Sequence, residues 1–200
     1  MYIHNMITKR DKLMLEDLNW DVLSRREQGY LLGIFIGDGS VFVNEKKGIY
    51  RVRFCLTKGE AVIQKIISLL QKLFKFHRIQ VYNDRKNETL IEVHSKSLVQ
   101  KLHEVLNSKT LKTVEQDSET LCGVIEGLID SDGYVKGRTV EIKSSNKQLV
   151  PQICYLLDKI GLKYKLTPTN SQLSDKIVWR FYFHLPHFIS PVKASSGRLS

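Results

Sequence analysis

The sequence predicts an α+β fold made of two pseudo-symmetric halves, each with the element order αββαββ and the first with one additional closing helix. Two observations predict it. A glycine-bearing helical segment that ends in Asp-Gly occurs twice, and after each copy the chain repeats the same order of alternating and helical segments. We expect the two glycine-bearing helices to pack on each other, so that the strands of both halves form a basic antiparallel β saddle.

The two glycine-bearing segments are residues 29–39 and 123–133, and a shift of 94 residues (132 − 38) places Asp38 on Asp132. In both copies small residues recur at i, i+4 and i+8, so they form one stripe along an α-helix. A glycine inside a helix costs about 1 kcal/mol relative to alanine, and repeated glycines favour close contact between two helix backbones. The C-terminal ends of the helices would then meet, each bringing one aspartate in front of a helix-ending glycine.

Residues 31–39 (LLGIFIGDG) and 125–133 (IEGLIDSDG) resemble the two motifs of a LAGLIDADG homing endonuclease in its single-chain, two-motif form. The resemblance implies that Asp38 and Asp132 are catalytic residues that bind divalent metal ions. Carboxylate oxygens without paired histidine or cysteine favour Mg²⁺ over zinc, and Mn²⁺ or Ca²⁺ could occupy the same site. The alternative is a pair of ordinary surface Asp-Gly turns. The duplication argues against that alternative.

The same resemblance implies a catalytic lysine at the end of the second strand of each half. Lys58 stands at that position in the first half, with a solvated residue of the first helical turn as the alternative. In the second half the matching residue is Ser145, so this half departs from the pattern, and Lys143 or Lys136 are the candidate replacements.

Two further acidic residues of the second motif, Asp130 and Glu126, match Ile36 and Leu32 of the first. Asp130 falls on a different helical face from Asp132. We therefore expect both to be structural.

The elements are placed by periodicity and by turn and capping signals. In the first half we expect the motif helix to start at a capping box in residues 24–27, a second capping box at 57–60, and strands at 40–44, 50–57, 79–82 and 89–94 with a closing helix at about 97–106. In the second half we expect strands at 134–136, 139–143, 162–167 and 177–185, with a helix that ends at Gly161 and that Pro151 delays or kinks. The domain boundaries are a leader at 1–23, a first half at 24–106, a linker at 107–118, a second half at 119–188 and a disordered tail at 189–200.

A formal net charge of +10 in 200 residues predicts a polyanionic partner, nucleic acid first and an anionic membrane surface second. A two-stranded ribbon fits the DNA major groove, and basic residues alternate with apolar ones along the predicted strands. The alternative for any single ribbon is the ordinary solvated face of an antiparallel sheet. The predicted DNA-binding residues on or beside strands are Arg51, Arg53, Lys143, Lys163, Lys165, Arg180 and Tyr182, and those in turns are Lys46, Lys47, Arg85, Lys86 and Arg138.

The resemblance and the charge together predict a monomeric, Mg²⁺-dependent, site-specific double-strand DNA endonuclease of the intron-encoded type. The family implies one cut per strand and 3′ overhangs. Two alternatives stay open: an RNA maturase that binds its intron RNA, and a catalytically silent DNA-binding protein on the same fold.

The location that we expect is inside the cell with DNA, in the cytoplasm, the nucleoid or an organelle. No segment has the roughly 20 apolar residues of a membrane span, and the first ten residues lack the apolar stretch of a secretory signal. Cys55, Cys122 and Cys154 are far apart among apolar residues, which predicts buried, reduced thiols.

Overall fold

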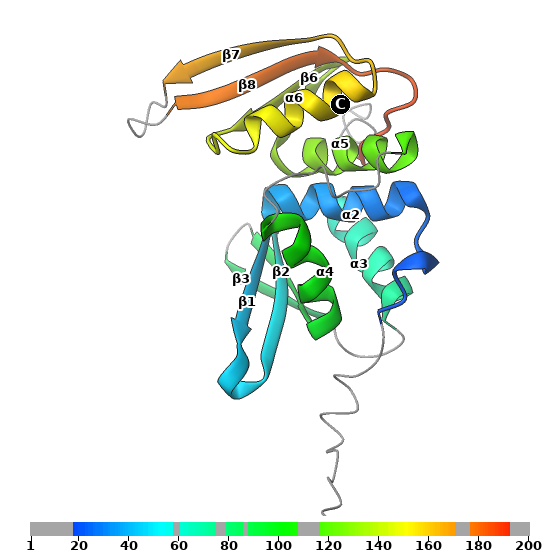
Figure 1. The fold of residues 1–200 in the computed structure, drawn as a ribbon, viewed down its shortest axis with the longest axis vertical. Coiled ribbons are helices and arrows are strands. Elements are labelled where there is room, and N and C mark those ends of the chain that lie inside the picture. Colours follow the sequence, from blue (N-terminus) through cyan, green and yellow to red (C-terminus); the bar gives the residue numbers. More distant parts are fainter. Residues whose placement is uncertain are drawn as a thin grey trace, which may run out of the picture.

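The computed structural model of the protein describes residues 18–57, 61–74, 79–85, 88–107, 117–170 and 177–192. It consists of two halves, each with one four-stranded antiparallel sheet, that meet through α2 (Arg25–Asp38) and α5 (Ser118–Asp132). Figure 1 shows these two helices side by side in the middle of the molecule, with the two sheets at opposite ends. The predicted α+β class and the pairing of the two motif helices are confirmed.

The two sheets have the same topology, β1-β2-β4-β3 and β5-β6-β8-β7. In the first half, the strands are β1 (Gly39–Asn44), β2 (Ile49–Thr57), β3 (Ile79–Arg85) and β4 (Glu88–His94), and the helices after the motif helix are α3 (Ala61–Leu73) and α4 (Lys96–Asn107). In the second half, the strands are β5 (Gly133–Lys136), β6 (Thr139–Ser144), β7 (Tyr164–Asn170) and β8 (Ile177–His184), and the remaining helix is α6 (Val150–Lys159). Two short 3₁₀ helices complete the described elements, η1 (Trp20–Val22) and η2 (Glu45–Lys47).

Capping residues place the start of each motif helix. Ser24 accepts a hydrogen bond from the backbone N–H of Glu27, whose carboxylate accepts one from the backbone N–H of Ser24, so the predicted capping box is present. At α5, Asp117 accepts from the backbone N–H of Thr120 at 2.9 Å. The second predicted capping box extends over residues 58–60, outside the described residues.

The glycine stripes bring the backbones of α2 and α5 into contact. A Cβ atom added to Gly29 would lie 2.1 Å from the carbonyl oxygen of Thr120, and one added to Gly33 would lie 2.2 Å from that of Val124. The contact is reciprocal, because a Cβ on Gly127 would lie 2.3 Å from the carbonyl oxygen of Tyr30. Only glycine fits at these points, and the two helices run in the same direction with their C-terminal ends together.

Each sheet has one apolar and one polar face. Val52, Phe54 and Leu56 of β2 are buried, and the alternating arginines of the same strand lie on the other face. In the second sheet, Ile142 and Phe181 are buried in the same way. The buried faces join α2, α5 and the outer helices in one hydrophobic core, which leaves the polar faces available for contacts.

The C-terminal strap, residues 187–192, packs on α5, so the prediction of a disordered tail was wrong for residues 189–192. Ile189 is 2% exposed. The backbone N–H of Ser190 donates to Glu126 at 2.6 Å, and that of Val192 donates to Asp130 at 2.8 Å. The prediction relied on the small, polar side chains of this segment, whereas the segment is held by its backbone N–H groups, which donate hydrogen bonds to two buried carboxylates. Residues 193–200 lie outside the described residues.

The three cysteines differ in exposure. Cys122 is buried as predicted, and Cys154 is half-buried. Cys55 is exposed because it alternates with Phe54 and Leu56 on β2 and so points to the polar face. The prediction of a buried thiol was therefore wrong for Cys55.

Among the helices that the structure describes, none is both long and apolar enough to cross a membrane.

Candidate active site and nucleic-acid interface

The junction of the two halves lies at the C-terminal ends of α2 and α5. A Cβ atom added to Gly37 would lie 2.1 Å from the hydroxyl oxygen of Ser131 and 3.2 Å from Oδ2 of Asp132. Asp38 follows Gly37 and ends α2, just as Asp132 ends α5. The two helix ends therefore bring one aspartate from each half to the same region. Asp38 is half-buried and Asp132 is exposed.

The glycine after each aspartate is required by space. Gly39 and Gly133 are extended, with φ of −94° and −85°, so neither adopts the left-handed conformation common at helix ends. A Cβ on Gly39 would lie 2.4 Å from the carbonyl oxygen of Phe35, and one on Gly133 would lie 2.5 Å from that of Ile129. Glycine lets the chain turn directly from helix to strand, which fixes the aspartate at the helix end.

The donor set at this junction suits a hard divalent cation. Among the described residues no group of three or more histidine, cysteine, aspartate or glutamate side chains could enclose a metal ion. Mg²⁺ is commonly held by only one or two carboxylates, together with water and substrate phosphate oxygens. Asp38 and Asp132 fit that pattern.

The candidate catalytic lysines are only partly described. Lys58 lies outside the described residues. Lys136 is exposed on β5. Lys143 lies on the outer face of β6, with its Nζ 3.8 Å from Oε1 of Glu141.

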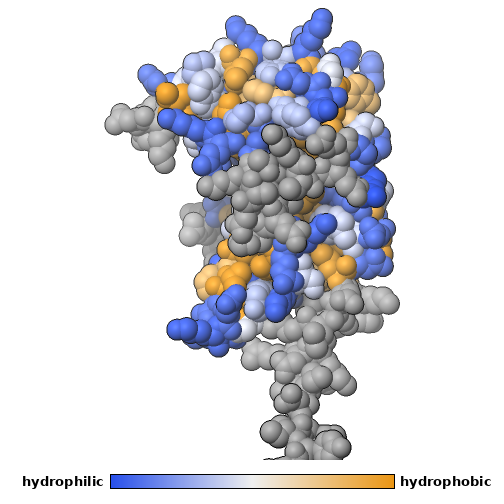
Figure 2. All heavy atoms as spheres, in the orientation of Figure 1, coloured by the Kyte–Doolittle hydropathy of each residue, from blue (hydrophilic) through white to orange (hydrophobic). Residues whose placement is uncertain are grey.

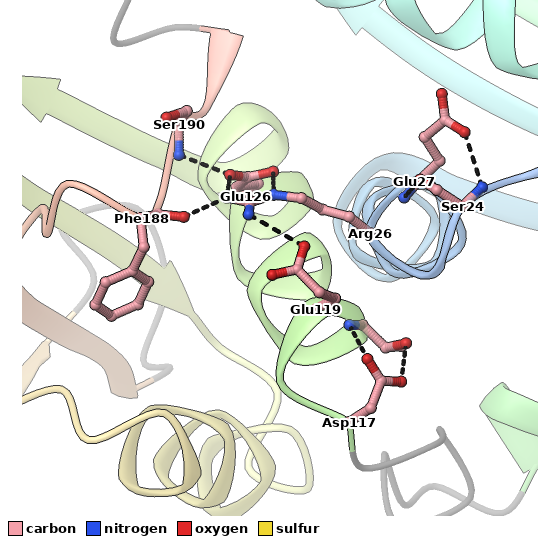
Figure 3. Close-up of polar contacts among 9 residues, drawn as sticks. Ser24, Arg26, Glu27, Asp117, Glu119, Glu126, Phe188 and Ser190 are labelled. Atoms are coloured by element: carbon pink, nitrogen blue, oxygen red, sulfur yellow. Dashed lines mark hydrogen bonds and ion pairs between the residues drawn. The ribbon is translucent and has the colours of Figure 1, made fainter.

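Glu126 is the centre of a polar network between α2, α5 and the C-terminal strap (Figure 3), and Asp130 lies one helical turn further along α5. Arg26 donates to both carboxylate oxygens of Glu126, at 2.5 and 3.2 Å, and to Glu119 at 3.3 Å. The hydroxyl of Tyr30 donates to Asp130 at 3.0 Å. Together with the bonds from the strap, these contacts account for both buried carboxylates as structural residues.

A pocket of about 590 Å³ opens beside this network, between α2, α3 and the strap. Its lining includes Arg26, Lys65, Glu126 and His187. Nζ of Lys65 lies 3.4 Å from the centre of the Tyr30 ring, and burial lowers the pKa of this lysine. Arg26 and Glu126 are hydrogen-bonded to each other, and Glu126 also accepts from the backbone of the strap. We therefore assign the pocket to the structural network that joins the two halves and not to a ligand site.

The outer face of the first sheet carries two arginines around a buried carboxylate. Nε of Arg53 donates to Oε2 of Glu92 at 2.7 Å, and Nε of Arg51 lies 3.6 Å from Oε1. His94 contacts the same carboxylate at 2.7 Å. On the other side, the ring of Phe42 lies 5.8 and 6.0 Å from the guanidinium carbons of Arg51 and Arg53. Burial opposes ionisation of Glu92, but the hydrogen bonds from Arg53 and His94 prevail and lower its pKa.

The outer face of the second sheet has a comparable centre. Arg180 donates from Nη1 to Oε1 of Glu141 at 3.0 Å, and the hydroxyl of Tyr182 donates to the same oxygen at 3.1 Å. Lys165 of β7 lies opposite Tyr182 in the sheet, so it shares this face. Arg138 is exposed in the β5–β6 turn, and its Nη2 donates to the carbonyl oxygen of Leu185 at 3.2 Å; its contact with DNA stays a prediction.

The other predicted contact residues lie in turns or at strand ends. Lys46 and Lys47 are exposed on η2, at the tip of the β1–β2 hairpin, and Figure 2 shows hydrophilic residues at this tip. Lys163 is exposed just before β7. Lys86 and the side chain of Arg85 lie outside the described residues.

Sequence reasoning missed Glu92, Glu141 and Phe42. All three occupy alternating positions that the sequence does show, but their partners lie on other strands. Arg53 and Glu92 are 39 residues apart and become directly opposite only in the register of β2 and β4.

Comparison with known proteins agrees with this architecture. An uncharacterised protein of Methanocaldococcus jannaschii is 23% identical over 147 residues, which are 68% of this chain and 55% of that protein. The chain thus spans about half the length of this curated relative.

Two solved structures have the same fold. The crystal structure of I-DmoI in complex with DNA and calcium has a TM-score of 0.69 and 20% identity, and the match covers 87% of this chain and 98% of that one. I-DmoI is named as a homing endonuclease. The homing endonuclease I-WcaI bound to its DNA recognition sequence has a TM-score of 0.55 and 12% identity, covering 92% of this chain and 84% of that one.

A sequence profile of the LAGLIDADG-like domain matches residues 26–107 and 119–185, which include both motif helices and both sheets. The chain therefore belongs to the LAGLIDADG family.

Proposed function

We propose that the protein is a site-specific, divalent-metal-dependent DNA endonuclease that hydrolyses one phosphodiester bond in each strand and leaves 3′ overhangs. The observation that carries the proposal is the meeting of two helix ends, each with one aspartate, at the junction of two sheets whose outer faces bear arginine and lysine. The complexes of I-DmoI and I-WcaI with DNA support the same kind of partner for this fold.

The outer faces would hold the DNA, and the helix ends would reach its backbone at the junction. Lys46 and Lys47 at the hairpin tip suit phosphate contacts, which position the duplex without reading its sequence. Arg51, Arg53 and Arg180 lie on strands and suit base contacts in the major groove.

Asp38 and Asp132 would hold Mg²⁺, with Mn²⁺ or Ca²⁺ as possible replacements. Such an ion, when bound, lowers the pKa of a coordinated water and stabilises charge on the departing 3′ oxygen. The protein would hold the two carboxylates in place at the ends of α2 and α5. Gly39 and Gly133, which follow them directly, turn the chain from helix to strand and so fix where each aspartate lies. Lys58 stays a candidate for polarising water or phosphate.

The pseudo-symmetry assigns one strand of the target to each half, which a single chain can cut as a monomer. We further propose that the gene lies within an intron and that the enzyme acts with DNA inside the cell. Retention of both aspartates argues against a catalytically silent DNA-binding protein.

The test is cleavage of plasmids that carry candidate intron-insertion sites by the purified protein, with Mg²⁺ and with a chelator. We expect linear product only with the metal ion. Asp38→Asn and Asp132→Asn should each abolish linearisation and leave binding in Ca²⁺ largely unchanged, because each removes one charge and little volume. Asp21→Asn is the matched control, since Asp21 is exposed on η1 at the opposite end of α2.

Full linearisation by either motif variant would remove that carboxylate from the reaction. Loss of only one strand's cut would show that the halves do not share their metal ions. No binding to any DNA would overturn the proposal itself.

A further inference from the structure

We infer that Glu92 and Glu141 are positioning residues for sequence recognition, which hold the arginines beside them in place so that the guanidinium nitrogens not bonded to these carboxylates contact bases. The inference rests on the DNA binding proposed above and names the residues that would set its specificity.

Glu92 is a buried carboxylate on a face that would bind DNA, and its presence there needs an explanation. It is 4% exposed at the middle of a face that would meet a polyanion. A carboxylate there weakens the attraction for phosphate, and burying it costs free energy unless it is paired and hydrogen-bonded. A surface built only for adhesion to DNA would gain by losing it. Its contacts with Arg51, Arg53 and His94 show what it does instead: it fixes basic side chains.

The geometry of Arg53 leaves its recognition edge available. Glu92 accepts a hydrogen bond from Nε of Arg53. In the described part of the chain, no hydrogen bond involves the two terminal nitrogens of Arg53. Those two nitrogens are a planar fork that matches O6 and N7 of guanine. The ring of Phe42, 44% exposed, lies beside the same guanidinium and limits its motion on the other side. Arginine loses much rotamer freedom when it binds, so fixing it beforehand improves discrimination.

Two other arginines have donors that the described chain does not satisfy. Nε of Arg51 and Nε of Arg180 are buried and have no hydrogen-bond partner among the described residues. Buried donors are normally paired, so each exception needs a specific explanation; Nε of Arg51 lies 3.6 Å from Oε1 of Glu92, which holds it by charge and not by a hydrogen bond. They occur beside Glu92 in one sheet and beside Glu141 in the other.

The two sheets reach this arrangement by different residues. In the first sheet the arginines are on β2 and the glutamate is on β4, whereas in the second the glutamate is on β6 and the arginine is on β8. The shared topology makes β2 equivalent to β6 and β4 equivalent to β8. The charges are therefore exchanged between the equivalent strands. A sequence repeat does not explain the exchange, so each half has its own carboxylate beside an arginine, buried in the case of Glu92 and half-buried in the case of Glu141.

The experiment is selection of a randomised duplex library by the wild-type protein in Ca²⁺, followed by binding measurements on every single-base variant of the selected target. Glu92→Gln keeps the size of the side chain and removes its charge. We expect discrimination at the base pairs read by Arg51 and Arg53 to fall by roughly 5- to 150-fold, the value of a lost bidentate contact. Affinity for unrelated DNA should rise. Glu45→Gln is the matched control, an equal charge change at an exposed residue of η2, and should raise affinity for all sequences alike.

The double-mutant comparison separates positioning from direct reading. If Glu92 acts through the arginines, Glu92→Gln adds no further loss in a protein that already carries Arg51→Ala and Arg53→Ala. An equal loss in that background would show that the glutamate itself reads a base and would overturn the inference. Unchanged discrimination in Glu92→Gln, beside a clear loss in Arg53→Ala, would overturn it as well.

Glu141→Gln gives a second, independent measurement if the first variant does not fold, because Glu141 is less buried than Glu92. Its effect should fall in the half of the target that the second sheet contacts, and an unaltered profile there would contradict the inference. A wild-type protein that selects no sequence would be a failure of the proposed function and not of this inference alone.

Discussion

Replacement of Gly33 by alanine should destabilise the protein, although alanine is the better helix former. A Cβ on Gly33 would lie 2.2 Å from the carbonyl oxygen of Val124, and ordinary contact begins at 3.4 Å, so α2 and α5 must separate by 1.2 Å (3.4 − 2.2) at this point. Overpacking costs about 1–3 kcal/mol, and a backbone neighbour that cannot rotate away places this site near the upper value. Subtracting about 1 kcal/mol of gained helix propensity leaves a loss of about 2 kcal/mol in the free energy of unfolding.

A loss of that size should lower the melting temperature of a chain of this length by about 4–8 °C, measurable by circular dichroism and checked by urea titration. Gly127→Ala requires the same separation of the helices, so the double variant should lose less than the sum of the two single losses. Gly161→Ala is the control: nothing lies within 4 Å of its Cβ position, its φ of +71° costs about 1 kcal/mol in alanine, and its loss should add fully to that of Gly33→Ala. An increase in stability for Gly33→Ala would refute the contact between the two backbones.

Two further predictions concern the buried carboxylates. Truncation after Val192 should leave the melting temperature unchanged, whereas truncation before His187 should lower it. The second deletion removes the backbone N–H groups of Ser190 and Val192, which donate hydrogen bonds to Glu126 and Asp130. Equal melting temperatures would mean that the strap does not stabilise the fold. The pKa of Glu92 is lowered in the folded protein, so its contribution to stability should be complete above its unfolded pKa of about 4.3 and lost as pH falls through the lower folded value. The unfolding free energies of wild type and Glu92→Gln from urea titrations should therefore begin to converge as pH falls below about 4.3 and should meet below the folded pKa, and a difference that stays constant into acid would assign the stabilisation to another group.

The sequence was informative where the structure depends on local periodicity. The i, i+4, i+8 stripe predicted the contact of the motif helices, and the alternation of Val52, Phe54 and Leu56 predicted which face of β2 is buried. Pro151 lies in the first turn of α6, which begins at Val150, a position where the missing N–H of proline breaks no helical hydrogen bond. Each of these features needs only residues a few positions apart.

Features that depend on distant residues were not predictable in this way. The pairing of Arg53 with Glu92 requires the register of two strands separated by α3 and β3. The bond from the backbone of Val192 to Asp130 joins residues 62 apart and has no side-chain signature at position 192. Burial of Asp130 could be guessed from its helical face, but the segment that covers it could not.

The two motif helices match each other, but the first hairpins of the two sheets are unequal in length, which bears on the DNA target that the protein would bind. β1 and β2 contain six and nine residues, whereas β5 and β6 contain four and six. At about 3.3 Å per residue the first hairpin is about 7–10 Å longer, which corresponds to about two or three base pairs at 3.4 Å each. We therefore expect the first half to protect a longer stretch of DNA on its side of the cleavage positions. Progressive shortening of the target from each end should reduce affinity earlier on that side, and equal tolerance on both sides would show that the hairpin tip does not reach the groove.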